Sequence, residues 1–226
     1  ILKMKKTMDS LVSGDRVEIT STDPGFPRDA AAWCNSTGNQ LISKETAGGK
    51  SVVVIEKGEP KSCNIVTSCE GKGKTFIMFS DDLDKALATF VLANGAAATG
   101  QKVTIFFTFW GLNVIKKLHK PNVEKDIFGK MFGMMLPSSS RKLKLSKMSM
   151  GGIGGKMMRY IMNRKGIDSL ESLRQQALEN GVEFIACQMS MDVMGVKQEE
   201  LLDEVTIGGV ATYMERADNA NINLFI

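Results

Sequence analysis

The sequence predicts an α/β protein in two parts, a small two-layer α+β sandwich followed by a three-layer α/β/α domain with a mainly parallel sheet. Three observations predict this. Short alternating segments and turns fill the first 57 residues, buried-type strand runs alternate with helical segments after residue 73, and a polar stretch with Gly, Pro and Ser separates them. We therefore expect domains at 1–57 and 73–226, joined by a linker at 58–72.

The first part has the order helix, strand, helix, strand, strand. In its first helix Ile1, Met4, Met8 and Leu11 share one apolar face. Its last two strands flank a Gly-Gly turn and resemble a hairpin. We expect that one strand of the sandwich is lost before Ile1, since a chain that starts with Ile is expected to be processed or truncated. The predicted elements are helices at 1–12 and 28–36 and strands at 16–20, 39–45 and 51–57.

The second part alternates strands with helices, which implies a parallel sheet with helices on both faces. Ser80 is the expected N-cap of its first helix, which has acidic residues in the first turn. The predicted strands are 74–80, 102–110, 182–187, 205–210 and 222–226, and the predicted helices are 81–99, 167–180, 198–203 and 211–220.

Residues 112–166 break this alternation. They hold eight of the 15 methionines and 13 basic against 2 acidic residues, a net charge of +11, whereas residues 167–226 carry −8. A lid that packs Met into a core, an adaptable binding or oligomer surface, and a membrane-surface helix are the three interpretations. The opposite charges favour self-association, so a homo-oligomer is expected, and scarce aromatics argue against nucleic acid as a partner.

Composition excludes several classes of protein. Of the 226 residues 43% are hydrophobic and 24% charged, which is ordinary for a globular chain and unlike collagen or a disulfide scaffold. Four Cys and one His argue against a zinc cluster, so no metal is expected, and few Cys fit a reducing cytoplasm. No apolar run reaches the roughly 18 residues of a membrane span, and the first residues lack the apolar region of a signal peptide.

Phosphate-binding motifs fail. The Gly-Lys-Ser at 49–51 and the Gly-Lys-Thr at 73–75 both lack the upstream glycine of a P-loop, and the glycine run at 151–155 follows no predicted strand. The only histidine, His119, stands in a lysine-rich stretch and is interpreted as solvated surface. No cofactor is therefore expected, although the alternating architecture alone would also suit a nucleotide or flavin binder.

Cys187 is the best candidate for chemistry. It ends a buried strand, and in open α/β sheets ligands bind beyond the carboxyl ends of the strands. A helix that begins near Ser190 would point its amides at the sulfur and favour the thiolate, the nucleophilic form. The alternative is a buried structural cysteine. Ser190 and Asp192 are expected beside the thiol, and Phe109 and Trp110, at the end of a neighbouring strand, are expected to wall its pocket.

The other three cysteines carry weaker signals. Cys34 stands within a short helix next to Trp33, where packing is the expected role. Cys63 and Cys69, with five residues between them, lie between the two predicted domains and could form a disulfide or relay sulfur, but no third Cys or His supports zinc.

Residues 1–57 resemble a TusA (SirA-like) sulfur-carrier domain. The matching stretches are ILKMKKTM (1–8), TDPGFPR (22–28), DAAAWC (29–34) and TGNQL (37–41). In that family the sulfur-accepting Cys belongs to a Cys-Pro-x-Pro motif directly before the first helix. This motif would fall upstream of Ile1, and Cys34 does not correspond to it.

Residues 73–226 resemble the DsrE/DsrF/DsrH-like family, whose fold is flavodoxin-type. The resemblance rests on FSDDL (79–83), ANGAA (93–97), FFTFWGL (106–112), MGGIGG (150–155) and ACQMSMDVMG (186–195), and Cys187 matches the sulfur-accepting Cys of the family. Related fusions place both modules behind a flavin-dependent disulfide reductase and a rhodanese domain, so a larger parent protein is plausible.

The two resemblances imply sulfur relay by a cysteine persulfide on Cys187, a sulfurtransferase-like activity with sulfur-donor and sulfur-acceptor proteins as partners. The alternative is a non-catalytic module that oligomerises and recruits partners within a larger redox protein.

Overall fold

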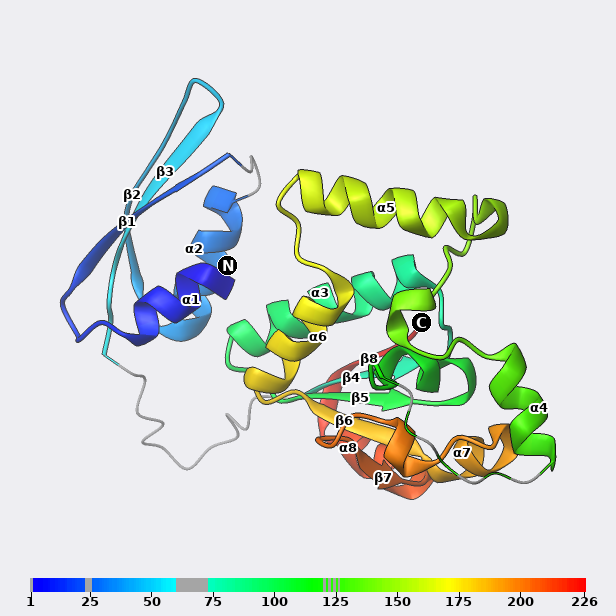
Figure 1. The fold of residues 1–226 in the computed structure, drawn as a ribbon. Coiled ribbons are helices and arrows are strands. Elements are labelled where there is room, and N and C mark those ends of the chain that lie inside the picture. The colour runs from blue at the N-terminus through cyan, green and yellow to red at the C-terminus, as the bar shows by residue number, and fades with distance from the viewer. Residues whose placement is uncertain are drawn as a thin grey trace. The chain divides into compact units, whose positions relative to one another are not determined.

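The computed structural model describes residues 2–22, 26–59, 73–119, 121, 123, 125 and 127–226. Two compact units divide the chain, residues 1–71 with 98–101 and residues 72–97 with 102–226. Each unit has its own sheet and its own helices (Figure 1). Cys63 and Cys69 fall outside the described residues, so their predicted roles stay predictions.

The first unit is a two-layer α+β sandwich. Its three strands form an antiparallel sheet in the order β1-β3-β2. Alternate residues of β3 are buried, and Val53 and Ile55 pack against Met8 of α1 and Trp33 of α2. The predicted order of elements is therefore confirmed. The elements are α1 (Leu2–Asp9), β1 (Arg16–Ser21), α2 (Phe26–Thr37), β2 (Gln40–Ala47) and β3 (Lys50–Glu56).

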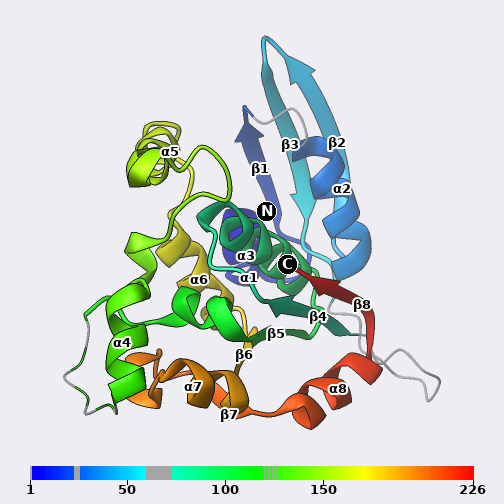
Figure 2. The same cartoon turned by 90° about the vertical axis from the view of Figure 1, so that its right-hand side faces the viewer.

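The second unit is built on a parallel five-stranded sheet in the order β7-β6-β5-β4-β8. The chain adds strands in one direction from β4 to β7 and then crosses back to place β8 on the other side of β4. Because such crossovers are right-handed, this reversal puts helices on both faces, with α3 and α6 on one face and α8 on the other (Figure 2). The strands are β4 (Gly73–Met78), β5 (Val103–Phe107), β6 (Glu183–Cys187), β7 (Thr206–Gly208) and β8 (Ala220–Phe225).

Different side chains cover the two faces of this sheet. Three aromatic rings, of Phe90, Phe107 and Phe184, meet on the α3 face, with centroids 5.3–6.4 Å apart. On the α8 face, Phe106 stacks on Tyr213 with the centroids 5.1 Å apart. The helices are α3 (Leu83–Ala98), α6 (Leu170–Glu179), α7 (Gln188–Met194) and α8 (Val210–Asp218).

Several predicted boundaries shift. The strand predicted to reach Trp110 ends at Phe107, because the chain turns sharply there into a 3-10 segment, η1 (Phe109–Ile115). The helix predicted from Asp81 begins at Leu83. The helix predicted over 198–203 is one 3-10 turn, η4 (Gln198–Glu200), and α7 begins at Gln188, slightly before the start expected near Ser190.

The excursion at 112–166 contains two helices, α4 (Ile127–Met135) and α5 (Ile153–Arg164), with the 3-10 turns η2 (Ser140–Lys142) and η3 (Met150–Gly152) between them. Only Met162 of its eight methionines is buried, and Met158 packs in part against the core. The other six are 47–88% exposed: Met131, Met134, Met135, Met148, Met150 and Met157. An exposed surface therefore describes this segment better than a lid that packs Met into a core.

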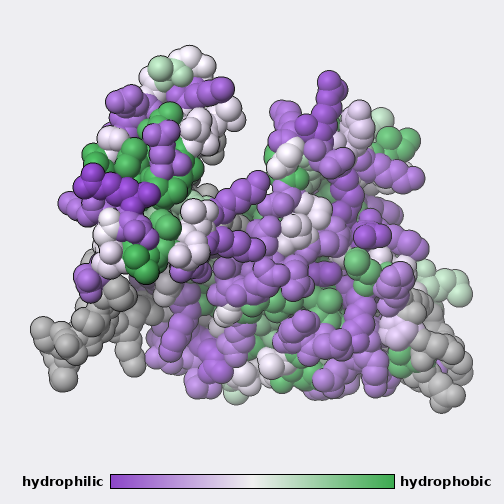
Figure 3. Space-filling model, turned by 60° about the vertical axis from the view of Figure 1, so that its left-hand side comes forward, coloured by the Kyte–Doolittle hydropathy of each residue, from purple (hydrophilic) through white to green (hydrophobic). Residues whose placement is uncertain are grey.

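Hydrophilic side chains predominate on the face drawn in Figure 3, and apolar side chains reach the surface there in separate patches. Within the described part of the chain, no helix combines the length and apolarity that crossing a membrane requires.

Candidate functional site at the carboxyl edge of the parallel sheet

Cys187 is the last residue of β6 and occupies the N-cap position of α7. The helix therefore begins at Gln188, one residue after the cysteine, rather than near Ser190 as predicted. The thiol is free and only 2% exposed. Its side chain joins an apolar cluster with Phe106, Ile185 and Tyr213 on the α8 face of the sheet.

Strand register identifies the lateral neighbours of Cys187. Along β5 and β6, Thr104 pairs with Glu183 and donates a 2.8 Å hydrogen bond to it, so paired residues point their side chains to the same face. Two residues further along, the paired residues Phe106 and Ile185 both belong to the apolar cluster that contains Cys187. The printed pairs end at Phe107 and Ala186, and the next residue, Thr108, keeps an extended backbone (φ −132°, ψ 151°), so a continued register would set Thr108 opposite Cys187. On the other side, Cys187 pairs with Gly208 of β7.

Two buried hydroxyls meet at the start of α7, the helix that Cys187 caps. The Oγ1 of Thr108 lies 2.8 Å from the Oγ of Ser190, and either can donate the hydrogen bond. Thr108 is 8% exposed, and Ser190, in the first turn of α7, is fully buried. This bond attaches the start of α7 to the end of β5, and it therefore fixes the segment that carries Cys187.

A tight turn follows Thr108. Phe109 adopts a left-handed backbone conformation (φ 47°), which is strained for a residue other than glycine. Gly111 donates from its N–H to the carbonyl oxygens of Phe79 and Thr108, at 2.9 and 3.0 Å. A Cβ on Gly111 would lie 1.9 Å from the carbonyl oxygen of Met78, so only glycine permits this approach.

The predicted pocket residues end up in different places. The ring of Phe109 packs against Phe79 with the centroids 5.4 Å apart, and Trp110 is 43% exposed. Asp192 is exposed and accepts a hydrogen bond from the Nε2 of Gln188 at 2.9 Å. Ser190 is thus linked to the neighbour of Cys187, whereas the Asp192 carboxylate is engaged at the surface.

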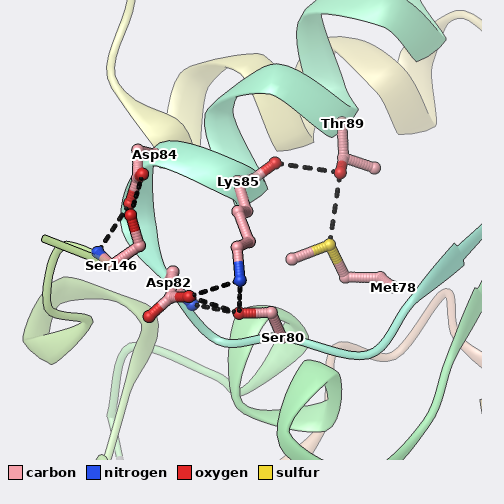
Figure 4. A network of polar contacts seen from close by, with 7 residues as sticks. All are labelled: Met78, Ser80, Asp82, Asp84, Lys85, Thr89 and Ser146. Carbon is pink, nitrogen blue, oxygen red and sulfur yellow. Dashed lines mark hydrogen bonds and ion pairs between the residues drawn. The ribbon is translucent and has the colours of Figure 1, made fainter. Parts of the chain in front are cut away.

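A polar network marks the end of β4, at the start of α3 (Figure 4). Ser80 donates to the Asp82 carboxylate at 2.8 Å, and Lys85 forms an ion pair with Asp82, also at 2.8 Å. Asp84 accepts hydrogen bonds from the backbone N–H and the hydroxyl of Ser146, which tie the excursion to α3. Burial opposes ionisation of Asp84, but the Ser146 bonds outweigh it and hold the pKa of this carboxyl below its usual value.

Asp81 directly precedes Asp82 of that network, and its pKa shifts in the opposite direction to that of Asp84. Burial raises its pKa, although Asn113 donates a 2.9 Å hydrogen bond to its carboxylate. Asn113 is fully buried, and within the described chain its Oδ1 has no partner. No three Cys, His, Asp or Glu side chains among the described residues gather in a way that could hold a metal ion.

A model of the DsrE/DsrF/DrsH-like family matches residues 71–225. The chain belongs to this family. A model of the sulfurtransferase TusA matches residues 1–57, so a TusA domain precedes the DsrE-like domain.

Relatives cover both domains. The "Uncharacterized protein YrkE" of Bacillus subtilis is 44% identical over 69% of this chain and 97% of its own length. The "Sulfur carrier protein DsrE2" of Allochromatium vinosum is 38% identical over 70% of this chain and 99% of its own length. The "Sulfur carrier protein TusA" of the same organism is 39% identical over 25% of this chain and 75% of its own length. In the solved structure of the ychN protein from E. coli, 99% of the chain aligns with 68% of this one, at a TM-score of 0.39 and 10% identity.

The sequence singles out Cys187 and Ser190 as site candidates, which stay predictions, and it gives no signal for Thr108 or Gly208, which the structure adds to the surroundings of the end of β6. The signal that would have found them is register. A parallel β5–β6 pair that ends at Phe107 and Ala186 would set Thr108 opposite Cys187 if it continued by one residue, and only a known pairing reveals this. Gly208 has a packing role, because a Cβ there would lie 2.8 Å from the Cγ2 of Ile185 and 3.3 Å from the Cβ of Thr212.

Proposed function

We propose that this DsrE-like chain is a sulfur-relay protein that accepts sulfane sulfur as a persulfide on Cys187 and passes it on. One observation carries the proposal: Cys187 is a free thiol at the carboxyl end of a central parallel strand, at the N-cap of α7 and beside a hydroxyl pair. Parallel sheets bind and transform ligands at this edge. Two relatives, one for each domain, are named sulfur carriers.

Sulfur transfer to Cys187 exchanges one sulfur–sulfur bond for another. The Cys187 thiolate attacks the outer sulfur of a donor persulfide, a new sulfur–sulfur bond forms, and the bond inside the donor persulfide breaks. The donor leaves as a thiolate and takes up the proton that Cys187 released. Delivery to an acceptor thiolate repeats the same exchange in the other direction. The transfer requires no external oxidant or reductant, and no metal takes part in it.

The partners follow from this chemistry. Sulfur-donor and sulfur-acceptor proteins would present a cysteine to Cys187, and the TusA domain would serve as the carrier module that brings sulfur to the DsrE-like domain. A sulfurtransferase makes the transfer faster than the spontaneous exchange, whereas a simple carrier does not. We propose a persulfide-carrying sulfurtransferase. We also propose a reducing compartment, where Cys187 persists as a thiol.

Access to the thiol sets one condition on this mechanism. Cys187 is 2% exposed, so a partner cysteine reaches it only when the groups that cover it move. Local opening of this kind is common at functional sites, because it involves the less stable parts of a fold. Slow loading of the folded protein is therefore compatible with the proposal.

The test is mass spectrometry of the intact chain after incubation with a small-molecule persulfide. The wild type should gain sulfur, and peptide mapping should place it on Cys187. Cys187→Ser should lose this sulfur, whereas the matched variant Cys34→Ala should keep it. Persulfide that survives on Cys187→Ser in equal amount would reject the assignment.

A second candidate function, a non-catalytic assembly module, is favoured by the excursion. Its exposed methionines adjoin cations that form no ion pair within the described chain, among them Lys144, Lys147 and Lys156. Opposite charges on other copies could meet this surface and form a homo-oligomer. Light scattering across salt concentrations tests it: a mass that falls with salt supports it, and a monomer at every salt concentration rejects it.

A further inference from the structure

We propose that Thr108, supported by Ser190, is a positioning residue that holds the outer sulfur of the Cys187 persulfide by a hydrogen bond. This inference rests on the proposed function, since it concerns the same cysteine. It assigns a role to a residue that the sequence pattern alone does not single out.

Placement is the first argument. Neighbouring strands lie about 4.8 Å apart. Phe107 pairs with Ala186, and Thr108 and Cys187 are the residues that follow this pair, so we infer from the extended backbone of Thr108 that the two side chains lie on the same face. An added sulfur lengthens the cysteine side chain by about 2 Å. The outer sulfur therefore comes within reach of the Thr108 hydroxyl when the persulfide turns toward β5. Toward β7 the corresponding residue is Gly208, which has no side chain to offer.

The number of hydroxyl hydrogens on Thr108 and Ser190 also supports the proposal. Thr108 and Ser190 together carry two hydroxyl hydrogens, and their mutual 2.8 Å bond uses one of them. The structure gives neither hydroxyl another side-chain or backbone acceptor within the described chain. When Ser190 donates to Thr108, the hydrogen of Thr108 is left for a further acceptor. A buried hydroxyl hydrogen without an acceptor is unfavourable, so a sulfur that accepts it is stabilised.

The surroundings of the thiol are the third argument. Phe106, Ile185 and Tyr213 surround Cys187 on the α8 face. A sulfur anion in apolar surroundings needs a hydrogen-bond donor. Two residues flank Cys187 at the ends of the neighbouring strands. Gly208 has no side chain, so the hydroxyl of Thr108 is the side-chain donor on offer there. A donor that is itself polarised by a second hydroxyl forms a stronger bond.

The experiment compares the lifetime of the Cys187 persulfide in the full chain. Each variant is loaded with a small-molecule persulfide and freed of excess reagent, and the fraction that keeps one extra sulfur is followed by intact-mass spectrometry. Thr108→Val keeps the shape and removes the hydroxyl, and we expect it to shorten the lifetime about tenfold. Thr108→Ser should restore the lifetime, and Ser190→Ala should have an intermediate effect.

The controls separate positioning from folding. Thr104→Val makes the same substitution on the same strand and face, four residues from Thr108, where the hydroxyl binds Glu183. It should leave the lifetime unchanged, and thermal unfolding of all variants reports their stability. Equal lifetimes in wild type, Thr108→Val and Thr108→Ser would overturn the role of Thr108. A wild type that takes up no sulfur on Cys187 would instead reject the proposed function, so the two failures are distinguishable.

Discussion

Cys34 and Cys187 are buried to nearly the same degree, 1% and 2% exposed, yet they lie in very different places. Cys34 lies within α2 of the TusA domain, in a core with Met4, Met8 and Trp33. Burial raises the pKa of its thiol, which keeps it protonated and inert. Cys187 lies at the end of a strand and the start of a helix, beside two hydroxyls.

The difference between them shows that two equally buried cysteines can have very different surroundings, so burial alone does not decide the role we propose for Cys187. Polar groups within reach of the sulfur, and the backbone position that carries it, are the informative features. Cys34 is in a helix interior, where the backbone amides are already bonded within the helix. The first amides of α7, after Cys187, have no intrahelical partner.

The largest effect expected from a single substitution is at Gly111. In Gly111→Ala the new methyl group would lie 1.9 Å from the Met78 carbonyl oxygen, so the turn after Thr108 must move. We expect a loss of about 3 kcal/mol of stability and a strong loss of sulfur loading on Cys187. Urea unfolding and intact-mass spectrometry measure the two effects.

Gly95→Ala is the matched control, because Gly95 lies within α3 and a Cβ there has no atom within 4 Å. It should raise stability by about 0.5–1 kcal/mol and leave loading unchanged. Modification of Cys34 should stay slow in both variants. If Gly111→Ala loaded sulfur as the wild type does, the turn would have no part in the site.

A smaller effect is expected at Cys34. Cys34→Ser places a hydroxyl in an apolar core and should cost about 1–3 kcal/mol, because the residue is 1% exposed among apolar side chains. Sulfur loading of Cys187 should not change. Cys34→Val, which keeps the site apolar, is the control and should destabilise less. A Cys34→Ser chain that folds as stably as the wild type but no longer loads would reverse the roles of the two cysteines.

Much of the fold follows from the sequence because its signals are local. The strand runs of the parallel sheet and the hairpin in the TusA domain are visible as period-two or continuous apolar segments, and the structure confirms them. The position of Cys187 at the end of a buried strand follows from the same kind of local signal, and the structure places it there. Thr108 could not be found this way, because its role depends on which strands pair and in which register.

The boundaries that failed have two causes, a tertiary contact and interrupting glycines. Residues 107–111 are apolar and aromatic like a strand, but the close approach of Gly111 to Met78 ends the strand early, and this is a tertiary contact. The helices of the excursion were missed because glycines interrupt their apolar pattern, at 129, 133, 154 and 155. Gly154 is required there, since a Cβ would lie 2.1 Å from the Met148 carbonyl oxygen.

The smallest effect we predict concerns the contacts that attach α5 to α6. It tests whether the Cys187 site depends on the excursion at 112–166. Glu171 of α6 binds Arg159 of α5 at 3.2 Å and accepts a 2.9 Å hydrogen bond from Ser140. Burial opposes ionisation of Glu171, but Arg159 and these hydrogen bonds outweigh it and lower the pKa of the carboxyl. Because the folded pKa is the lower one, the stabilisation is complete above the unfolded value of about 4.3 and disappears as the pH falls through the folded pKa.

Glu171→Gln should therefore cost about 1 kcal/mol at pH 7, and the difference from wild type should vanish at pH values below the folded pKa. Urea unfolding at several pH values measures this. The control Glu199→Gln changes an exposed carboxylate that makes no ion pair within the described residues, and it should leave stability unchanged. Sulfur loading should survive in both variants, because the pairing of β6 with β5 and of Cys187 with Gly208 holds the end of β6 in the sheet. A loss of loading in Glu171→Gln alone would instead make the excursion part of the site.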